Sequence, residues 1–171
     1  DTLVRFNNET QELEPGLAVS WSSEDGGKTY VFKLREGVKF HNGEELKAFN
    51  VRDGYGIRCL LTSDVEVAII TGRNARLMED RCKTLGIRHL YQGQSDKLLA
   101  YGELLDKLSL SDQQVAYIGD DLIDWPVMAK VGLSVAVADA HPVLLPRAHY
   151  VTRIAGGRGA VREVCDLILM S

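Results

Sequence analysis

Three carboxylates follow an apolar run in the second half of the sequence. Residues 115–118 are mostly apolar, Gly119, Asp120 and Asp121 come directly after them, and Asp124 follows three positions later. Like charges at this density repel one another and lose hydration at the edge of a sheet. A bound cation would offset both costs. The alternative is that these acids cap a helix and occupy its first turn, where carboxylates are also favourable.

Two other positions suit a phosphate group. Thr71, Gly72 and Arg73 end the apolar run of residues 65–70, and a hydroxyl, a backbone N–H and a guanidinium all match phosphate oxygens. Helix capping explains Thr71 equally well. Lys97 opens a predicted helix, where its charge opposes the helix dipole. It is therefore either a phosphate-neutralising group or an ordinary solvated lysine.

The composition indicates a soluble globular protein. The 171 residues carry a net charge of -4 and 45% hydrophobic residues, without a basic stripe for nucleic acid or an apolar run of the ~20 residues that span a bilayer. The opening residues lack the basic and apolar regions of a signal peptide. The odd number of cysteines, at Cys59, Cys82 and Cys165, favours reduced thiols in a cytoplasmic protein over disulfides or a zinc cluster. His89 and His141 lack ligand-spaced partners and are interpreted as structural.

The pattern changes near residue 42. Before it, β-branched and aromatic residues predict β-structure, and residues 28–51 are expected to form an extended hairpin with a turn at Asn42-Gly43. After residue 57, strands alternate with helices. Strands are expected at 65–71, 89–93, 115–119, 133–137 and 150–154, and helices at 74–86, 95–108, 124–132 and 159–170, with Ser95 as an N-cap. This alternation predicts an α/β fold with a parallel sheet, and Thr71 and Asp120 at the same carboxyl edge.

The segments "VAIITGR", "QSDKL" and "AYIGDD" together resemble motifs two, three and four of the haloacid dehalogenase superfamily. Longer stretches, including "RCKTLGI" and "VGLSVAVADAHP", are similar to the phosphatases in it that act on 3-deoxy-D-manno-octulosonate 8-phosphate, in lipopolysaccharide biosynthesis. The resemblance covers residues 43–171. It implies a three-layer, Rossmann-like fold with a β-hairpin extension, hydrolysis of a small sugar phosphate, Mg²⁺ as cofactor, no membrane or nucleic-acid partner, and a homotetramer with hairpins between subunits.

The resemblance also implies a role for each site residue. Asp120 would ligate Mg²⁺, with Asp121 and Asp124 supporting the metal shell. Thr71 would hydrogen-bond a phosphate oxygen, and Lys97 would neutralise the charge that develops on the phosphoryl group. The remaining candidates, for contacts with the substrate's phosphate or carboxylate, are Gly72, Arg73, Arg52 and Arg158.

The superfamily's first motif, an apolar strand ending in Asp-x-Asp-Gly that supplies the nucleophile, is absent. The nearest imitation, Ser23 to Gly26, has Ser at the nucleophile position and reads better as a turn. Residues 1–42 instead resemble a segment of the periplasmic peptide-binding proteins of ABC importers, through "LEPGLAVSW" and "DGGKTYVFKLREGVKFHNG". The sequence thus predicts a chimera of residues 1–42 and 43–171, in which the first core strand is replaced, no nucleophile is present and phosphatase activity is impaired. A non-catalytic scaffold and a peptide-binding fragment remain the alternatives.

Overall fold

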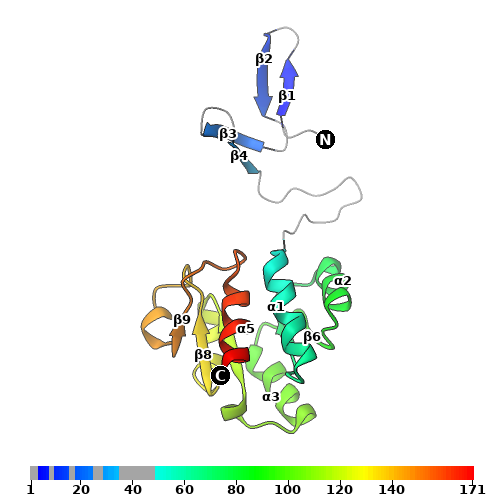
Figure 1. Cartoon of the computed structure of the whole chain (residues 1–171), viewed down its shortest axis with the longest axis vertical. Helices are drawn as coiled ribbons and strands as arrows, with labels where there is room; N and C mark the ends of the chain where they lie inside the picture. The colour runs from blue at the N-terminus through cyan, green and yellow to red at the C-terminus, as the bar shows by residue number, and fades with distance from the viewer. Residues whose placement is uncertain (1–3, 8–9, 16–17, 25–28, 35–48) are drawn as a thin grey trace. The chain divides into compact units, whose positions relative to one another are not determined.

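The structure is a computed structural model that describes residues 4–7, 10–15, 18–24, 29–34 and 49–171. The chain divides into two compact units, Asp1–Lys47 and Ala48–Ser171, which appear in Figure 1 in blue and in cyan to red. Each unit has its own secondary structure. Among the described residues, no helix combines the length and apolar character needed to cross a membrane.

The described part of the first unit consists of two antiparallel hairpins. Strand β1 (Val4–Asn7) pairs with β2 (Glu12–Pro15), and β3 (Ala18–Glu24) pairs with β4 (Thr29–Leu34). The prediction of extended structure is confirmed over residues 29–34. Residues 35–48, with the expected Asn42-Gly43 turn, lie outside the described residues. At its other end the prediction is wrong, because a helix begins at Val51.

The second unit alternates short strands with helices. The strands are β5 (Ala68–Ile70), β6 (His89–Tyr91), β7 (Ala116–Gly119), β8 (Leu133–Ala136) and β9 (Tyr150–Val151). The helices are α1 (Val51–Thr62), α2 (Arg76–Leu85), α3 (Lys97–Leu108), α4 (Trp125–Met128) and α5 (Ala160–Met170). Residues 49–171 also contain 3₁₀ turns at Asp112–Gln114, Leu122–Asp124 and Leu145–Arg147.

All five strands of the second unit pair in parallel, as the alternating pattern predicts, but they form two separate sheets. One sheet is β5-β6 and the other is β7-β8-β9. Within the described residues, no hydrogen-bonded ladder joins β5 to β7. The strands that end in Thr71 and Asp120 are therefore both sheet edges.

The helices pack in two groups. Helices α1 and α5 lie side by side in Figure 1 and pack against each other, whereas α3 and α4 contact each other and the strands β5, β7 and β8. One core cluster is centred on α4, β8 and the segment after β8, and contains Met128, Ala136, Val137, Ala140, Leu144 and Ala160. A second cluster joins Tyr101 of α3 to Val127 and Val131.

The sequence did not predict helix α1. Its glycines lower helix propensity and hide the helical pattern. Gly56, however, allows α1 to pack closely against α5 because it has no side chain. A Cβ atom at Gly56 would lie 2.9 Å from Arg162 Cδ and 3.0 Å from Cys165 Cβ. At the start of the helix, the side chain of Asn50 accepts a hydrogen bond from the Arg52 backbone N–H at 2.9 Å, which is an N-cap.

Several element boundaries differ from the sequence prediction, and hydrogen bonds explain two of them. Asp96, not Ser95, caps α3, because its carboxylate accepts the Leu98 backbone N–H at 2.9 Å. Helix α4 ends at Met128 instead of reaching residue 132. Four residues later, the Gly132 backbone N–H donates to the carbonyl of Asp112 at 2.8 Å. This bond is incompatible with a continued helix and leads the chain into β8.

Candidate functional site

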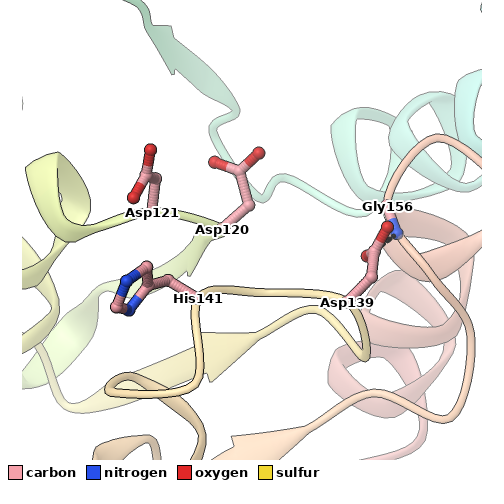
Figure 2. A pocket seen from close by; sticks show the side chains of 5 residues that line it. All are labelled: Asp120, Asp121, Asp139, His141 and Gly156. Carbon is pink, nitrogen blue, oxygen red and sulfur yellow. Dashed lines mark hydrogen bonds between the residues drawn. The ribbon is translucent and has the colours of Figure 1, made fainter.

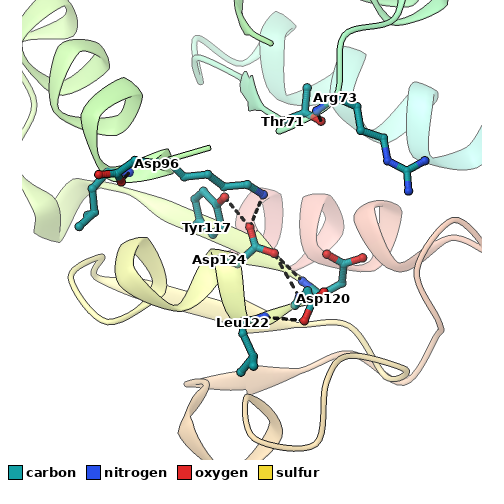
Figure 3. Close-up of polar contacts among 10 residues, drawn as sticks. Thr71, Arg73, Asp96, Tyr117, Asp120, Leu122 and Asp124 are labelled. Atoms are coloured by element: carbon teal, nitrogen blue, oxygen red, sulfur yellow. Dashed lines mark hydrogen bonds and ion pairs between the residues drawn. The ribbon is translucent and has the colours of Figure 1, made fainter. Parts of the chain in front are cut away.

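A buried ion pair stands at the centre of the candidate site. Lys97 Nζ lies 2.6 Å from Asp124 Oδ1, with side-chain exposures of 11% and 3%. Lys97 is the first residue of α3, after β6, and Asp124 ends the 3₁₀ turn after β7. The pair therefore joins the segments that follow the carboxyl ends of strands in the two sheets (Figure 3).

Hydrogen bonds occupy both oxygens of the Asp124 carboxylate. Oδ1 also accepts the Tyr117 hydroxyl at 2.7 Å, and Oδ2 accepts the backbone N–H groups of Asp120 at 3.1 Å and Asp121 at 3.2 Å. Burial works against the charged form, but the bonds from Lys97 and Tyr117 outweigh it and lower the pKa of Asp124. Burial, with the negative charge of Asp124 beside it, raises the pKa of Tyr117, so Tyr117 remains a donor.

The capping alternative for the acidic cluster holds for two of its three members. Asp121 accepts the Leu122 backbone N–H at 2.7 Å, and Asp121 and Asp124 form a reciprocal capping box around the 3₁₀ turn. The same side chains that resemble metal-site residues thus also hold the local backbone in place. Asp124 acts as a positioning residue, because it fixes the backbone from which Asp120 and Asp121 project.

Asp120 and Asp121 are both exposed and line an open hollow of about 370 Å³, together with Asp139, His141 and Gly156. Figure 2 shows the carboxylates of Asp120 and Asp121 side by side at this hollow. Burial and then the adjacent charge of Asp124 raise the pKa of Asp120. Protonation is therefore more favourable at Asp120 than at Asp124, whose carboxylate is paired with Lys97.

Thr71 and Arg73 follow β5 and lie across from the acidic cluster in Figure 3. The Thr71 hydroxyl accepts the Arg73 backbone N–H at 3.2 Å, and the Thr71 carbonyl accepts the Gln94 backbone N–H at 3.0 Å. Gln94 is three residues before Lys97, which reaches Asp124. This chain of bonds puts the carboxyl ends of β5 and β7 at the same edge, where Gly72 is also exposed.

The other two candidate substrate contacts, Arg52 and Arg158, do not line the hollow. Arg52 is exposed in the first turn of α1. Arg158 is exposed in the turn before α5, and its backbone N–H donates to the carbonyl of Ala155 at 3.1 Å. Arg158 is two residues from Gly156, so it is next to the hollow along the chain.

The donor set fits a divalent cation only in part. In the part of the chain that the structure describes, no three His, Cys, Asp or Glu side chains converge on a metal position, since Asp124 faces Lys97. Asp120 and Asp121 supply carboxylate oxygens, which Mg²⁺ prefers, but Mg²⁺ needs six oxygen ligands in an octahedron. The described residues offer a half-site, with the other positions left to water or substrate oxygens.

Three residues at this site are not evident from sequence patterns. The pattern predicts Tyr117 only as a strand residue. It lies near the end of the apolar run that leads to the acidic cluster, which was the available signal. Asp139 accepts the Gly156 backbone N–H at 2.7 Å and thereby joins two segments that line the hollow. His141 was interpreted as structural, and its backbone N–H does donate to the Asp120 carbonyl at 2.8 Å, but the residue also lines the hollow.

Two protein families match separate parts of the chain. Residues 86–163 match the haloacid dehalogenase-like hydrolases. Residues 12–55 match the middle region of bacterial extracellular solute-binding proteins of family 5. The two matches do not overlap.

Relatives of high identity match about three quarters of the chain. The 3-deoxy-D-manno-octulosonate 8-phosphate phosphatases of Escherichia coli and Yersinia pestis are 79% and 80% identical over 131 residues, which is 77% of this chain and 70% of each relative. The crystal structure of the Yersinia pestis phosphatase superposes with a TM-score of 0.76 at 79% identity, over 78% of this chain and 72% of that one. A Moraxella catarrhalis phosphatase of the same name, solved with magnesium ion, phosphate ion and a KDO molecule, gives 0.75 at 43% identity, over 78% and 76%.

These likenesses account for the α/β fold of the matched part. The chain covers 70% of the length of each of these two phosphatases, and the Asp-x-Asp-Gly motif is absent from its sequence. On the identity and coverage of these relatives, the chain belongs to the 3-deoxy-D-manno-octulosonate 8-phosphate phosphatase family, within the haloacid dehalogenase-like hydrolases.

Proposed function

We propose that the second unit holds the metal and substrate half of a Mg²⁺-dependent phosphatase site for 3-deoxy-D-manno-octulosonate 8-phosphate, with turnover far below that of its relatives. The observation that carries the proposal is the Lys97–Asp124 ion pair, which holds Thr71 and Asp120 at one edge of the unit. The relatives' names supply the substrate. The sequence supplies no Asp-x-Asp-Gly nucleophile.

Each side chain has a role that suits phosphoryl transfer, which depends mainly on positioning and charge neutralisation. The Thr71 hydroxyl donates to a phosphate oxygen, and the backbone N–H of Gly72 adds a second donor. Lys97, held by Asp124, neutralises charge on the phosphoryl group. The exposed guanidiniums that would contact the substrate's phosphate or carboxylate are Arg73, Arg52 and Arg158.

Asp120 would hold Mg²⁺ directly and Asp121 would hold it through its own carboxylate or a water, while Asp124 positions both. Bound Mg²⁺ supplies positive charge that offsets the negative charge of a phosphate group. A relative solved with magnesium and phosphate supports this choice of cation. With only part of the octahedral ligand set present, we expect weak Mg²⁺ binding.

Calorimetric titration with inorganic phosphate at saturating Mg²⁺ tests the half-site. We expect binding that depends on Mg²⁺ and is lost in an Asp120→Asn variant. Lys107 is a matched control for Lys97, because it lies in the last turn of the same helix and is exposed. Lys97→Met should weaken phosphate binding and Lys107→Met should not. Equal effects of the two substitutions would contradict the role given to Lys97.

The solute-binding match over residues 12–55 favours one further candidate, capture of an extended peptide by the first unit. The match covers only a fragment of such a protein, and the described hairpins pair only within themselves. Titration of the chain with short peptides of mixed sequence tests this candidate. Heat of binding that survives Asp120→Asn would support it over the phosphatase site.

Three further proposals concern the origin of the two parts of the chain, its cellular location and its oligomeric state. We propose that residues 1–42 and 43–171 are of separate origin, that the chain acts in the cytoplasm with its three thiols reduced, and that it forms a homotetramer. Apolar side chains that are well exposed in the second unit support self-association, with Val51 at 82%, Leu99 at 68% and Tyr55 at 61%. Sedimentation velocity of the purified chain tests the oligomer.

A further inference from the structure

Two cysteines lie where the first and the last helix of the second unit pack together. Helices α1 and α5 contact each other and lie side by side in Figure 1. Cys59, on α1, is half-buried, and Cys165, on α5, is buried with 2% of its surface exposed. Neither thiol has a part in the proposed phosphatase chemistry, so their placement calls for a separate explanation.

Contacts along the two helices fix their register. Near the start of both helices, the Asp53 carboxylate accepts the Arg162 backbone N–H at 2.8 Å. One turn later, a Cβ atom at Gly56 would lie 3.0 Å from Cys165 Cβ and 3.1 Å from Cys165 Sγ. The helices therefore run in the same direction, and the Cys165 thiol lies against the surface of α1 at Gly56.

Cys59 is the next residue along that surface of α1. It follows Gly56 by three positions, and residues three apart on a helix have Cβ atoms about 5–6 Å apart on the same face. Helical side chains also lean toward the N-terminus of their helix, which brings the Cys59 thiol back toward Gly56. Because Cys165 Sγ already lies at Gly56, the two sulfur atoms share a stretch of the interface into which Gly56 places no side chain.

The electrostatics of the interface also bring the two thiols together. Burial, and then the charges of Asp166 and Asp53, raise the pKa of Cys165 to about 11, and the charge of Cys59 adds to this rise. The hydrogen bond to Asp166 is the main cause that raises the pKa of Arg162, and the charge of Cys59 contributes there too. Cys59 therefore interacts with two neighbouring residues of α5.

We propose that Cys59 and Cys165 form a thiol-oxidation site that takes a hydroperoxide and closes a disulfide bond between α1 and α5. Both thiols are reduced in the resting chain. Half-buried Cys59 reacts first, because it is the thiol that an oxidant can reach, and buried Cys165 then attacks the oxidised sulfur. The bond ties the first helix of the second unit to its last.

The reaction takes place in two balanced steps. The Cys59 thiolate attacks one peroxide oxygen, the O–O bond breaks, and the oxygen that leaves takes up a proton, so that Cys59 becomes a sulfenic acid. The Cys165 sulfur then attacks the sulfenic sulfur, the S–O bond breaks, and hydroxide leaves as water with the Cys165 proton. Two thiols and one hydroperoxide thus give one disulfide, one alcohol and one water. The raised pKa of Cys165 slows the second step, so the sulfenic acid at Cys59 can be trapped.

Oxidation of the whole chain with hydrogen peroxide tests the site. The chain is reduced, freed of reductant and treated with peroxide, and its remaining thiols are then blocked before digestion and mass spectrometry without reduction. The free thiols should fall from three to one, with one linked pair of peptides that contains Cys59 and Cys165. A link through Cys82, two chains joined through Cys59, or oxidation of one cysteine or none would overturn the site.

Serine variants separate the roles of the two thiols. Cys165→Ser removes the second thiol, so dimedone should trap the sulfenic acid at Cys59 at least about fivefold more than in the unchanged chain. Cys82→Ser is the matched control, because Cys82 is buried to a similar degree but lies on α2, and it should leave the link intact. Equal trapping in these two variants would contradict the role given to Cys165.

The bond should also stabilise the unchanged chain, which needs no variant. It closes the loop from Cys59 to Cys165, which spans most of the second unit, and a cross-link over a long loop restricts the unfolded chain strongly. The urea midpoint of the oxidised chain should lie about 1–2 M above that of the reduced chain, and dithiothreitol should reverse the shift. A linked chain with an unchanged or lower midpoint would show that the bond distorts the packing of α1 on α5, and would overturn the proposal.

Discussion

Lys97 and Asp124 form an ion pair of 2.6 Å that joins the segment after β6 to the segment after β7. No ladder connects the two sheets within the described residues, so this pair is the polar bond between their carboxyl ends. Tyr117 and two backbone N–H groups complete the shell around the Asp124 carboxylate. The acidic cluster is therefore held as a unit before any ligand arrives.

Removing the charge of Asp124 should destabilise the second unit. Breaking one partner of a buried pair costs about 3–5 kcal/mol, and we expect Asp124→Asn to lie near the lower value because Lys97 retains a path to solvent. The matched control is Asp166→Asn, which breaks the partly exposed Arg162–Asp166 pair on α5 and should cost less than about 1 kcal/mol. Urea unfolding of both variants measures the difference. Equal losses would contradict the structural role of Asp124.

The same pair makes stability depend on pH. The pKa of Asp124 is lowered in the folded state, so its contribution is fully present above the ordinary value of 3.8 and is lost as the pH falls through the lower folded value. The wild-type chain should therefore lose more free energy of unfolding than Asp124→Asn as the pH is lowered below 3.8. Unfolding curves at several acidic pH values check this, and parallel losses in the two proteins would refute it.

The packing around Asp124 leaves no room for a side chain at Gly119. A Cβ atom there would lie 2.5 Å from Asp124 Cβ and 2.8 Å from Met128 Sδ. Gly119→Ala should cost about 1–3 kcal/mol through overpacking and weaken phosphate binding by displacing Asp124. Gly102 on α3 has nothing within 4 Å of an added Cβ, so Gly102→Ala should stabilise the chain by about 0.5–1 kcal/mol. Thermal unfolding that moves both variants the same way would count against this packing.

The three cysteines should differ in reactivity toward a thiol reagent. Cys82 and Cys165 are buried, and Cys59 is half-buried. Burial, with help from the charges of Asp166 and Asp53, raises the pKa of Cys165 to about 11, and burial raises that of Cys82 as well. Because the thiolate is the reactive form, Cys59 should be labelled first at pH 8. Mass spectrometry after brief labelling identifies the site, and early modification of Cys165 would contradict the packing of α5.

Local patterns were sufficient to predict most elements of the second unit. Apolar runs bounded by glycine gave strands such as β7, and Gly86 ends α2 in the left-handed conformation, as its position predicts. Helix α1 was missed because Gly54 and Gly56 weaken its pattern. Both glycines permit close packing, of Gly54 on Arg81 of α2 and of Gly56 on α5. Such contacts involve residues distant in sequence, which periodicity does not detect.

The candidate site was predictable as a set of residues but not as an arrangement. The sequence placed Thr71 and Asp120 at one edge, yet the direct bond between Lys97 and Asp124 and the inward turn of Asp124 depend on tertiary packing. The separation of β5 from β7 was likewise beyond local pattern, since each strand is ordinary by itself. Only the missing Asp-x-Asp-Gly motif predicted that the first core strand is replaced.

The most direct measurement is the steady-state rate of phosphate release from 3-deoxy-D-manno-octulosonate 8-phosphate at saturating Mg²⁺, compared with the Yersinia pestis phosphatase under the same conditions. Because loss of a nucleophile typically costs on the order of 10⁴ to 10⁶ in rate, we predict a deficit of at least about 10⁴. Turnover within about tenfold of the relative, abolished by Asp120→Asn, would contradict the account. It would mean that the first unit supplies a nucleophile, with Asp25 as the first residue to replace.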